Sequence, residues 1–303
     1  MLLPGTGLEC DAPGRTPLTY LSHAAVRTAA TRVLATSGTV ELAGRMERCA
    51  ADITPSLGRP FALGDLDVTL LPSGYIPGAS HLLVARPDGG RTLFVSRMGR
   101  DDELAGVACD TIVLAPGLHD PAAAIRVAAG DRKLLSWIKG VLVRGQAPVL
   151  LLEIPAMLAR LGPVLSRAGL DAGATRAVGA CSRRLASRGL DMSCTVRRGG
   201  PRDGELFLAA LPRGRREAVR LPRKARVAAA VDAAGADPAA GVSVEVVHRI
   251  AHAAGLDAYE RLVEGCGARV VHLGAGLEAL PSRAGSRGPD VRWIRPERQM
   301  GLG

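Results

Sequence analysis

The sequence predicts a large α/β protein, and three observations along its 303 residues lead to that prediction. Short apolar runs separated by turn residues crowd the first 120 residues, which is typical of half a β-sandwich. After residue 120, strand-like and helix-like segments alternate, which indicates an α/β layer. From residue 242 to 273 the pattern returns to a strand, a helix and a strand. The length suits one large domain or two ordinary ones.

The expected strands of the first 120 residues are short and bounded by turn residues. The run 67–71 alternates apolar and polar residues, and the turn sequence at 87–90 between two apolar runs is a strong hairpin signal. An Ala-rich stretch at 24–30 is compatible with a helix, and Val40, Leu42 and Met46 predict a second helix over 38–49. The other expected strands are 18–21, 32–36, 81–85, 92–96 and 111–114.

The second half of the chain contains the expected helices. Apolar residues at helical spacing predict a helix over 121–145. A strand at 149–152 and a helix at 156–168 follow. Residues 228–241 are rich in Ala, Asp, Gly and Pro with no clear period, and we interpret them as a linker. The last expected elements are a strand at 242–247, a helix at 256–264 and a strand at 269–273.

Composition narrows the class of protein. Lys and Arg number 39 against 29 Asp and Glu, and the net charge of +10 favours a phosphate-bearing or other anionic partner. Eight aromatic rings are too few for a long base-stacking platform. The six cysteines are far apart and form no C-x-x-C pair, which favours free thiols in a reducing compartment over disulfides or a zinc site. No signal-peptide pattern and no apolar run of about 18–20 residues is present, so we expect a cytoplasmic protein without a membrane partner.

Common catalytic motifs do not occur in the sequence. We find no G-x-x-x-x-G-K-[ST], no H-E-x-x-H and no G-x-S-x-G. Of the six histidines, His248 and His252 have the four-residue spacing that could place both on one helix face, but no adjacent acid or thiol completes a zinc site. A surface or core pair is therefore favoured over a metal-binding pair.

Seven segments in consecutive order resemble the motifs of the metallo-β-lactamase fold and its β-CASP nuclease branch. Residues 18–24 (LTYLSHA) resemble the strand end before H-x-H-x-D-H, and 70–80 (LLPSGYIPGAS) resemble P-A-G-H-x-x-G-S. Residues 250–253 (IAHA) occupy the place of S-D-H-A. The remaining similar segments are 91–96, 109–113, 145–170 and 267–280. The families most similar to this pattern are the ligase-associated DNA exonucleases and the RNA-processing β-CASP enzymes.

The resemblance implies a fold and a division into domains. The expected fold is an αββα metallo-β-lactamase sandwich with a β-CASP-like α/β cap. Residues 1–120 would form the N-terminal half of the sandwich and 121–226 the cap, with a basic segment at 196–226. Residues 227–303 would return to the sandwich.

The departures from the family pattern fall on the residues that bind two zinc ions in the family. His23 is retained in the first motif, whereas Ala25, Arg27 and Thr28 replace its other ligands. The other replacements are Tyr75 for a histidine, Arg97 or Met98 for the bridging aspartate (depending on the gap), Ala115 for a glutamate, and Ala275 for the last histidine, with His272 three residues away. His252 matches the cap histidine that the family uses near the scissile phosphate.

These replacements predict a site without zinc or another cofactor. A catalytic zinc needs about three protein ligands, and two-metal cleavage needs two such sites about 4 Å apart. Alanine and threonine methyl groups cannot bind a metal, and an arginine adds a permanent cation. The residues of this vestigial cleft are His23, Arg27, Tyr75, Arg97 and His252. Two alternatives stay open: the cleft binds phosphate through Arg27 without cutting, or it is filled and inert, with His23 a hydrogen-bonded histidine at a strand end.

A basic segment at 196–226 is the second candidate site. It holds ten Lys and Arg against three acids, a net charge of +7, and we expect sequence-independent, salt-sensitive contacts to a nucleic-acid backbone. A solvated loop is the alternative. The residues expected to bind nucleic acid are Arg213, Arg215, Arg216, Arg220, Arg223, Lys224 and Arg226.

The leading functional hypothesis is a pseudoenzyme of the nuclease family. It would act as a subunit that binds nucleic acid or scaffolds a partner, and the resemblance implies an active nuclease or a DNA ligase as that partner, in DNA repair. A second hypothesis is an active hydrolase or exonuclease with misplaced ligands, or with one metal held by His23, His248, His252 and His272. A third is a structural protein with an incidental basic loop.

Overall fold

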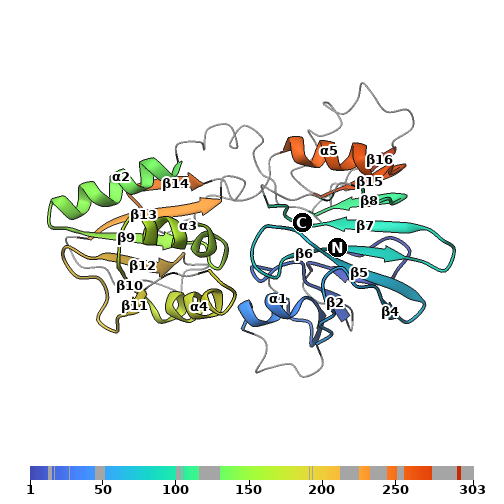
Figure 1. The fold of residues 1–303 in the computed structure, drawn as a ribbon, viewed down its shortest axis with the longest axis horizontal. Helices are drawn as coiled ribbons and strands as arrows, with labels where there is room; N and C mark the ends of the chain where they lie inside the picture. The colour runs from blue at the N-terminus through green and yellow to red at the C-terminus, as the bar shows by residue number, and fades with distance from the viewer. Residues whose placement is uncertain are drawn as a thin grey trace, which may run out of the picture. The chain divides into compact units, whose positions relative to one another are not determined.

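The structure is a computed structural model of the 303-residue chain. It describes residues 1–12, 16, 18–26, 28–44, 52–99, 104, 106–115, 130–190, 192, 194–211, 225–232, 244–250, 256–274 and 292–294. The chain forms two compact units, unit 1 (Met1–Pro121 and Ala253–Gly303) and unit 2 (Ala122–His252). Both units combine helices with sheets that contain parallel strands, so the chain has a mixed α/β fold (Figure 1).

Unit 1 contains a seven-stranded sheet in the order β16-β15-β8-β7-β6-β5-β4. The strands β4 to β7 pair antiparallel, and β7, β8, β15 and β16 are parallel neighbours. The expected hairpin is present, because Ala85 pairs with Arg91 across residues 86–90. The strands are β4 (Phe61–Leu63), β5 (Leu66–Pro72), β6 (Ser80–Ala85), β7 (Arg91–Val95), β8 (Thr111–Leu114), β15 (Val270–Leu273) and β16 (Arg292–Ile294).

A second, three-stranded parallel sheet of unit 1 consists of β1 (Glu9–Cys10), β2 (Leu18–Tyr20) and β3 (Arg32–Leu34). Helix α1 (Ser37–Leu42) follows β3 and starts at Thr36, whose hydroxyl accepts a hydrogen bond from the Thr39 amide at 3.1 Å. Val40 of α1 packs with residues around β3, so α1 covers one face of this small sheet.

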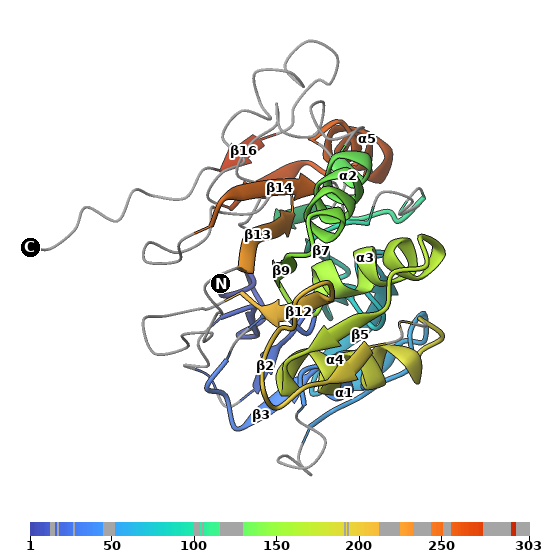
Figure 2. The same ribbon diagram turned by 90° about the vertical axis from the view of Figure 1, so that its left-hand side faces the viewer.

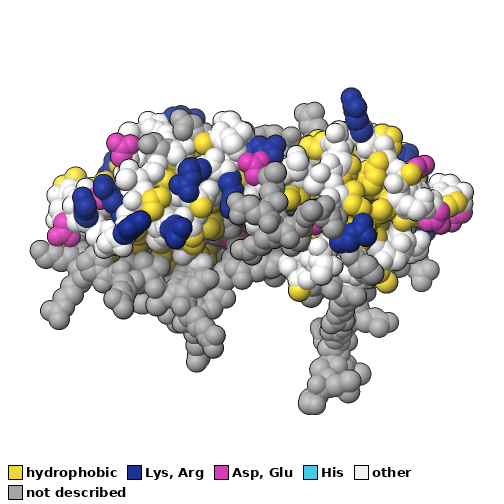
Figure 3. Space-filling model, turned by 90° about the horizontal axis from the view of Figure 1, so that it is seen from below, with side chains coloured by type: hydrophobic (Ala, Val, Ile, Leu, Met, Phe, Trp, Pro, Cys, Tyr) yellow, Lys and Arg dark blue, Asp and Glu magenta, His cyan; other side chains and the backbone are white. Residues whose placement is uncertain are grey.

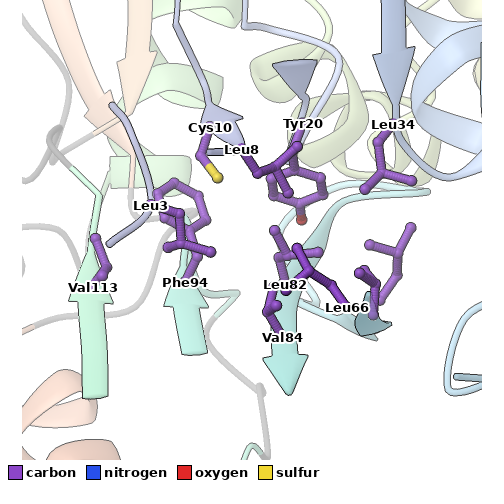
Figure 4. Close-up of a cluster of buried hydrophobic side chains, with 12 residues drawn as sticks. Leu3, Leu8, Cys10, Tyr20, Leu34, Leu66, Leu82, Val84, Phe94 and Val113 are labelled. Atoms are coloured by element: carbon purple, nitrogen blue, oxygen red, sulfur yellow. The ribbon is translucent and has the colours of Figure 1, made fainter. Parts of the chain in front are cut away.

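The hydrophobic core of unit 1 lies between the two sheets (Figure 4). Tyr20 and Leu34 come from the small sheet, whereas Leu82, Phe94 and Val113 come from the large one, and all five are fully buried. The rings of Tyr20 and Phe94 meet edge to face with centroids 5.8 Å apart. The two sheets therefore form one packed body.

Helix α5 (Leu256–Cys266) packs on the large sheet of unit 1 through both of its ends. Near its first turn, the Tyr259 hydroxyl accepts a hydrogen bond from the Met98 amide at 3.2 Å. At its last residue, the Cys266 carbonyl accepts one from the Cys109 amide at 3.2 Å, just before β8. Tyr259 is only 2% exposed, so this contact belongs to the interior.

The topology brings several strand ends of unit 1 to one edge. The parallel strands β7, β8 and β15 end there, and β5 ends where the antiparallel β6 begins. The end of β2 in the small sheet joins this edge, because the Ser80 amide donates to the Ser22 carbonyl at 2.8 Å. The loops that follow these strands are thus neighbours although they lie far apart in the sequence.

Unit 2 is built on a six-stranded, fully parallel sheet in the order β11-β10-β12-β9-β13-β14. All six residues of β9 are buried, as expected for an inner strand of a parallel sheet. Three helices lie beside the strands (Figure 2). The elements are α2 (Gly130–Val143), β9 (Ala147–Leu152), α3 (Ala156–Arg167), β10 (Ala172–Ala174), α4 (Arg176–Ala186), β11 (Cys194–Val196), β12 (Leu206–Ala210), β13 (Ala225–Asp232) and β14 (Val246–Ile250).

The helix expected over 38–49 ends at Leu42, and the strand expected at 242–247 is found at Val246–Ile250. Two further expected segments differ in kind. The linker expected from residue 228 begins instead with the strand β13, in which Ala228, Ala229 and Ala230 are fully buried. The expected helix over 24–30 is a turn and irregular chain in its described residues, where the Thr28 hydroxyl accepts a hydrogen bond from the Ala30 amide at 3.1 Å. Such a local side-chain bond competes with helix formation.

The expected domain boundary at 226/227 is also corrected. Unit 2 continues to His252, because β13 pairs with β9 and with β14 in the sheet of unit 2. The return to unit 1 comes with α5 and β15. None of the described helices is long and apolar enough to cross a membrane.

Candidate functional site

Three residues of the predicted vestigial cleft meet at the strand-end edge of unit 1. His23 follows β2, Tyr75 lies between β5 and β6, and Arg97 follows β7. The rings of His23 and Tyr75 pack edge to face with centroids 5.3 Å apart. The Nη1 atom of Arg97 donates to the Tyr75 hydroxyl at 2.9 Å, and its Cζ atom lies 5.5 Å from the centre of the Tyr75 ring. Arg27 and His252, the other two residues of the cleft, lie outside the described residues.

The backbone holds Tyr75 and Arg97 next to each other. The Gly99 amide donates to the Ser73 carbonyl at 2.6 Å, which joins the two loops. A Cβ atom on Gly99 would lie 2.2 Å from the Gly74 carbonyl oxygen, so only glycine permits this approach. Tyr75 is 1% exposed and Arg97 is partly exposed, so their hydrogen bond is half-buried.

Asp11 adds a carboxyl group at the same edge. It follows β1, and Oδ1 and Oδ2 accept hydrogen bonds from the amide and the hydroxyl of Ser22 at 2.8 and 2.5 Å. Burial raises the pKa of Asp11 from 3.8 to about 6, although both bonds from Ser22 and the charge of Arg97 act to lower it. Asp11 could not be found from the sequence because a two-residue strand gives no pattern, and a carboxylate directly after a strand is the only signal.

A buried polar network lies beside this cluster. The Ser80 carbonyl accepts hydrogen bonds from the hydroxyls of Tyr20 and Ser96 at 2.7 and 2.9 Å. Nδ1 of His81 accepts one from the Ser96 amide at 3.1 Å, and His81 is fully buried. The hydroxyl of Tyr259 donates to the Ser96 carbonyl at 3.3 Å. This network fixes the start of β6 and the end of β7, which carry the loops of Tyr75 and Arg97.

The residues gathered at this edge do not fit a zinc centre of the kind expected from the family. Beside His23 stand a tyrosine hydroxyl that accepts from Arg97 and a permanently charged guanidinium. Ala115, at the end of β8, packs on the core and offers no side-chain ligand. In the part of the chain that the structure describes, no group of three or more His, Cys, Asp or Glu could hold a metal ion.

His248 belongs to a different environment. It lies on β14 in unit 2, 8% exposed, with its ring 5.9 Å from that of Trp137 on α2. Burial and the charge of Lys133 lower the pKa of His248. His272 lies within β15, where it pairs with Val113. The four histidines of the single-metal hypothesis are thus distributed over both units, with His252 outside the described residues.

One residue of the predicted nucleic-acid set is described, and it is paired. Arg226 is an exposed residue near the start of β13. It donates through Nε and Nη2 to both carboxylate oxygens of Glu245. This two-point ion pair raises the pKa of Arg226 and lowers that of Glu245. The pairing offsets the charge that Arg226 would offer to a phosphate. The other six, Arg213, Arg215, Arg216, Arg220, Arg223 and Lys224, lie outside the described residues.

Comparison with solved structures finds the crystal structure of a protein of unknown function from Enterococcus faecalis V583. The TM-score is 0.62 and the identity 12%, with 93% of this chain and 79% of that chain covered. At this identity the likeness concerns the fold alone. No protein-family model and no curated protein matches the chain.

The charge of the chain is unequally divided between its two units. Unit 2 contains 22 Lys and Arg against 10 Asp and Glu, a net charge of +12. Unit 1 contains 17 against 19, a net charge of −2. The whole positive excess therefore belongs to unit 2. The strand-end cluster (His23, Tyr75, Arg97 and Asp11) lies in unit 1, whose net charge is close to zero.

Proposed function

We propose that the chain is a non-catalytic relative of the metallo-β-lactamase-fold exonucleases that binds nucleic acid or scaffolds a partner. In this proposal unit 1 is the αββα sandwich and unit 2 the β-CASP-like cap. The two facing sheets with α1 and α5 on them support the first assignment, together with the order of the similar sequence segments. The parallel sheet of unit 2 with its helices supports the second.

The contact between Tyr75 and Arg97 carries the non-catalytic part of the proposal. These two residues stand where the resemblance expects a histidine ligand and the bridging carboxylate. Their side chains are bonded to each other at 2.9 Å, and the guanidinium charge would repel a dication at that place. A group that attracts anions thus replaces one that holds cations.

The charge of unit 2 carries the binding part of the proposal. A body of 131 residues with a net charge of +12 attracts a polyanion at long range. Arginine supplies most of this charge, and its planar fork suits phosphate oxygens. The partner-scaffolding role, with an active nuclease or a DNA ligase as partner, rests on the resemblance alone.

Metal content and nucleic-acid binding of the full chain test the two parts together. We expect purified protein, saturated with zinc and then dialysed, to hold well below one zinc per chain by elemental analysis, because the described residues of the strand-end cluster provide no ligand set. We expect it to bind a 20-base-pair duplex equally well with and without chelator. As a control, the Arg97→Asp variant with Tyr75→His restores two donors of the family pattern and should hold more zinc than the wild type.

Two results would contradict the proposal. About two zinc ions per wild-type chain, lost together with nuclease activity in chelator, would show an active metalloenzyme. Absence of duplex binding at low salt would remove the nucleic-acid role.

A further inference from the structure

Helix α4 presents a row of arginines that no acidic residue of the helix balances. Its eleven residues contain Arg176, Arg183 and Arg184 and neither Asp nor Glu, and Arg188 follows one turn later. Arg176 and Arg183 are exposed and lie seven residues apart, which places them on the same side of the helix about 10 Å apart. From Arg176 to Arg184 the row is about 12 Å long at ~1.5 Å per residue.

Strand β11, at the edge of the sheet of unit 2, lies next to α4. A Cβ atom on Gly179 would lie 2.3 Å from Cγ2 of Val196, so α4 lies directly on the end of β11. The same point on Gly179 is 3.8 Å from Nη1 of Arg183, which places that guanidinium beside Val196. Arg198 and Arg202, both exposed, follow β11. We call the three arginines of the helix the α4 arginine face: Arg176, Arg183 and Arg184.

The charges of this face are largely unpaired within the described part of the chain. Arg197, directly after β11, pairs with Glu205 at 3.0 Å. Among the described residues, by contrast, no acidic side chain forms an ion pair with Arg176, Arg183, Arg184, Arg198 or Arg202. Among the described residues, the exposed acids nearest in sequence are Asp171 and Asp203, and Asp191 lies outside the described residues. In the space-filling view, Lys and Arg side chains recur across the unit that carries α4, with few acidic ones between them (Figure 3).

We propose that the α4 arginine face binds the sugar-phosphate backbone of a nucleic-acid duplex. The inference rests on the proposed function and names the surface and the form of the partner. A duplex carries one negative charge per about 1.7 Å of its axis, so its two strands together carry about seven charges along ~12 Å. Arg176, Arg183 and Arg184 form no ion pair with a described acid, so they can turn toward these phosphates without first breaking an ion pair.

The lack of exposed rings on this face favours a duplex over a single strand. Single-strand binding typically uses aromatic side chains on which the bases stack. The ring nearest in sequence to the face, Phe207, is 1% exposed inside the sheet of unit 2. A duplex keeps its bases stacked on each other and offers its backbone outward, which matches a surface of arginines alone.

The experiment compares three charge-matched variants of the full chain by fluorescence anisotropy. The test variant is Arg176→Gln/Arg183→Gln/Arg184→Gln. The first control, Arg132→Gln/Lys133→Gln/Lys139→Gln, removes three exposed cations from α2 in the same unit. The second control, Arg213→Gln/Arg215→Gln/Arg216→Gln, removes three from the basic segment. Labelled 20-base-pair DNA and RNA duplexes of mixed sequence are titrated between 50 and 200 mM salt.

We expect the α4 variant to bind roughly tenfold or more weakly than the wild type at the same salt. The slope of log affinity against log salt should fall by about 2–3, since each lost phosphate contact removes about 0.9 from it. The α2 variant should change the slope by less than about 1. Arg176→Lys/Arg183→Lys/Arg184→Lys should keep most of the slope, because the charge is retained. Circular dichroism and the unfolding temperature verify that each variant is folded.

Several outcomes would overturn the inference and leave the proposed function intact. These are duplex binding by the wild type that the α4 variant retains, equal losses in the α2 variant, or a loss confined to the basic-segment variant. Tighter binding of a 20-nucleotide single strand would contradict the choice of a duplex, and binding to phosphatidylserine vesicles but not to duplexes would indicate a membrane surface instead. Failure of the wild type to bind either duplex at 50 mM salt would contradict the proposed function itself. The two duplex arms decide between DNA and RNA.

Discussion

At the scale of single residues, the burial of the Asp11 carboxyl group at the strand-end edge has an electrostatic cost. Its carboxyl group takes two hydrogen bonds from Ser22 and lies in the field of Arg97, yet burial dominates and raises its pKa. The native state therefore prefers the protonated form more than the unfolded chain does. The ionised carboxylate is a destabilising element of the fold at neutral pH.

The pH dependence of stability should reveal this cost. Because the folded pKa of about 6 lies above the ordinary 3.8, the contribution of Asp11 to stability is present below pH 3.8 and is lost as the pH rises through 6. Asp11→Asn mimics the protonated form at every pH. We expect the variant to gain roughly 1–2 kcal/mol relative to the wild type between pH 4 and pH 8, a value reduced for partial exposure.

Urea unfolding of both proteins at pH 4, 6 and 8 measures this difference. Asp67→Asn, at an exposed position of β5, is the matched control. A constant difference between Asp11→Asn and wild type across this range would contradict the assigned pKa.

The residues of the candidate site could be predicted only where a motif pattern located them. His23, Tyr75 and Arg97 come from three similar segments, and the structure places them in mutual contact. The hydrogen bond between Tyr75 and Arg97 could not be predicted, because it depends on the close approach of Gly74 and Gly99 across two loops. Asp11 and Ser22 were missed because their pairing follows from the register of β1 and β2.

At the scale of elements, the contact of α4 with β11 depends on one residue without a side chain. Gly179 lies in the middle of α4, where alanine would favour the helix by about 1 kcal/mol. The Cβ of that alanine would meet Val196 at 2.3 Å. The steric cost should exceed the gain in helix propensity.

We expect Gly179→Ala to lower the free energy of unfolding by about 1–3 kcal/mol, as overpacking usually does. Gly140→Ala in α2 is the control, because its Cβ would meet only the flexible Arg144 side chain at 3.6 Å, and it should stabilise the protein by up to about 1 kcal/mol. Gly179→Ala/Val196→Ala should recover most of the loss. Chemical denaturation at pH 7 measures all three, and equal effects at the two glycines would refute the steric explanation.

The elements of unit 1 were more predictable than the last strands of unit 2. Turn residues delimit β6 and β7, and their hairpin is confirmed by the pairing of Ala85 with Arg91. The strand β13 was read as a linker because alanines buried on both faces leave neither alternation nor large apolar residues. The resemblance placed the domain boundary at residue 226, whereas unit 2 extends to His252 because β13 and β14 belong to its sheet.

At the scale of the whole molecule, the positive charge is concentrated in one of the two units. Unit 2 carries a net charge of +12 and the α4 arginine face, whereas unit 1 is nearly neutral and holds the strand-end cluster. Long-range attraction of a polyanion thus falls to unit 2. The sequence predicted an anionic partner from the total charge, and the division into units assigns the whole positive excess to unit 2.

The place of β15 in the large sheet has a consequence for the order of folding. β8 pairs with β7, which is close in sequence, and with β15, which follows the whole of unit 2. Contacts of large sequence separation form late, so unit 2 should acquire its structure while one side of β8 still lacks its neighbour.

Pulsed hydrogen exchange during refolding of the full chain tests this order. We expect amides of β9 and β12 to become protected before those of β15, which pair with β8. Protection of β15 before β9 would contradict it. During synthesis the open side of β8 is a template for pairing with a second chain. Aggregation therefore threatens this protein in the interval before residues 270–273 emerge.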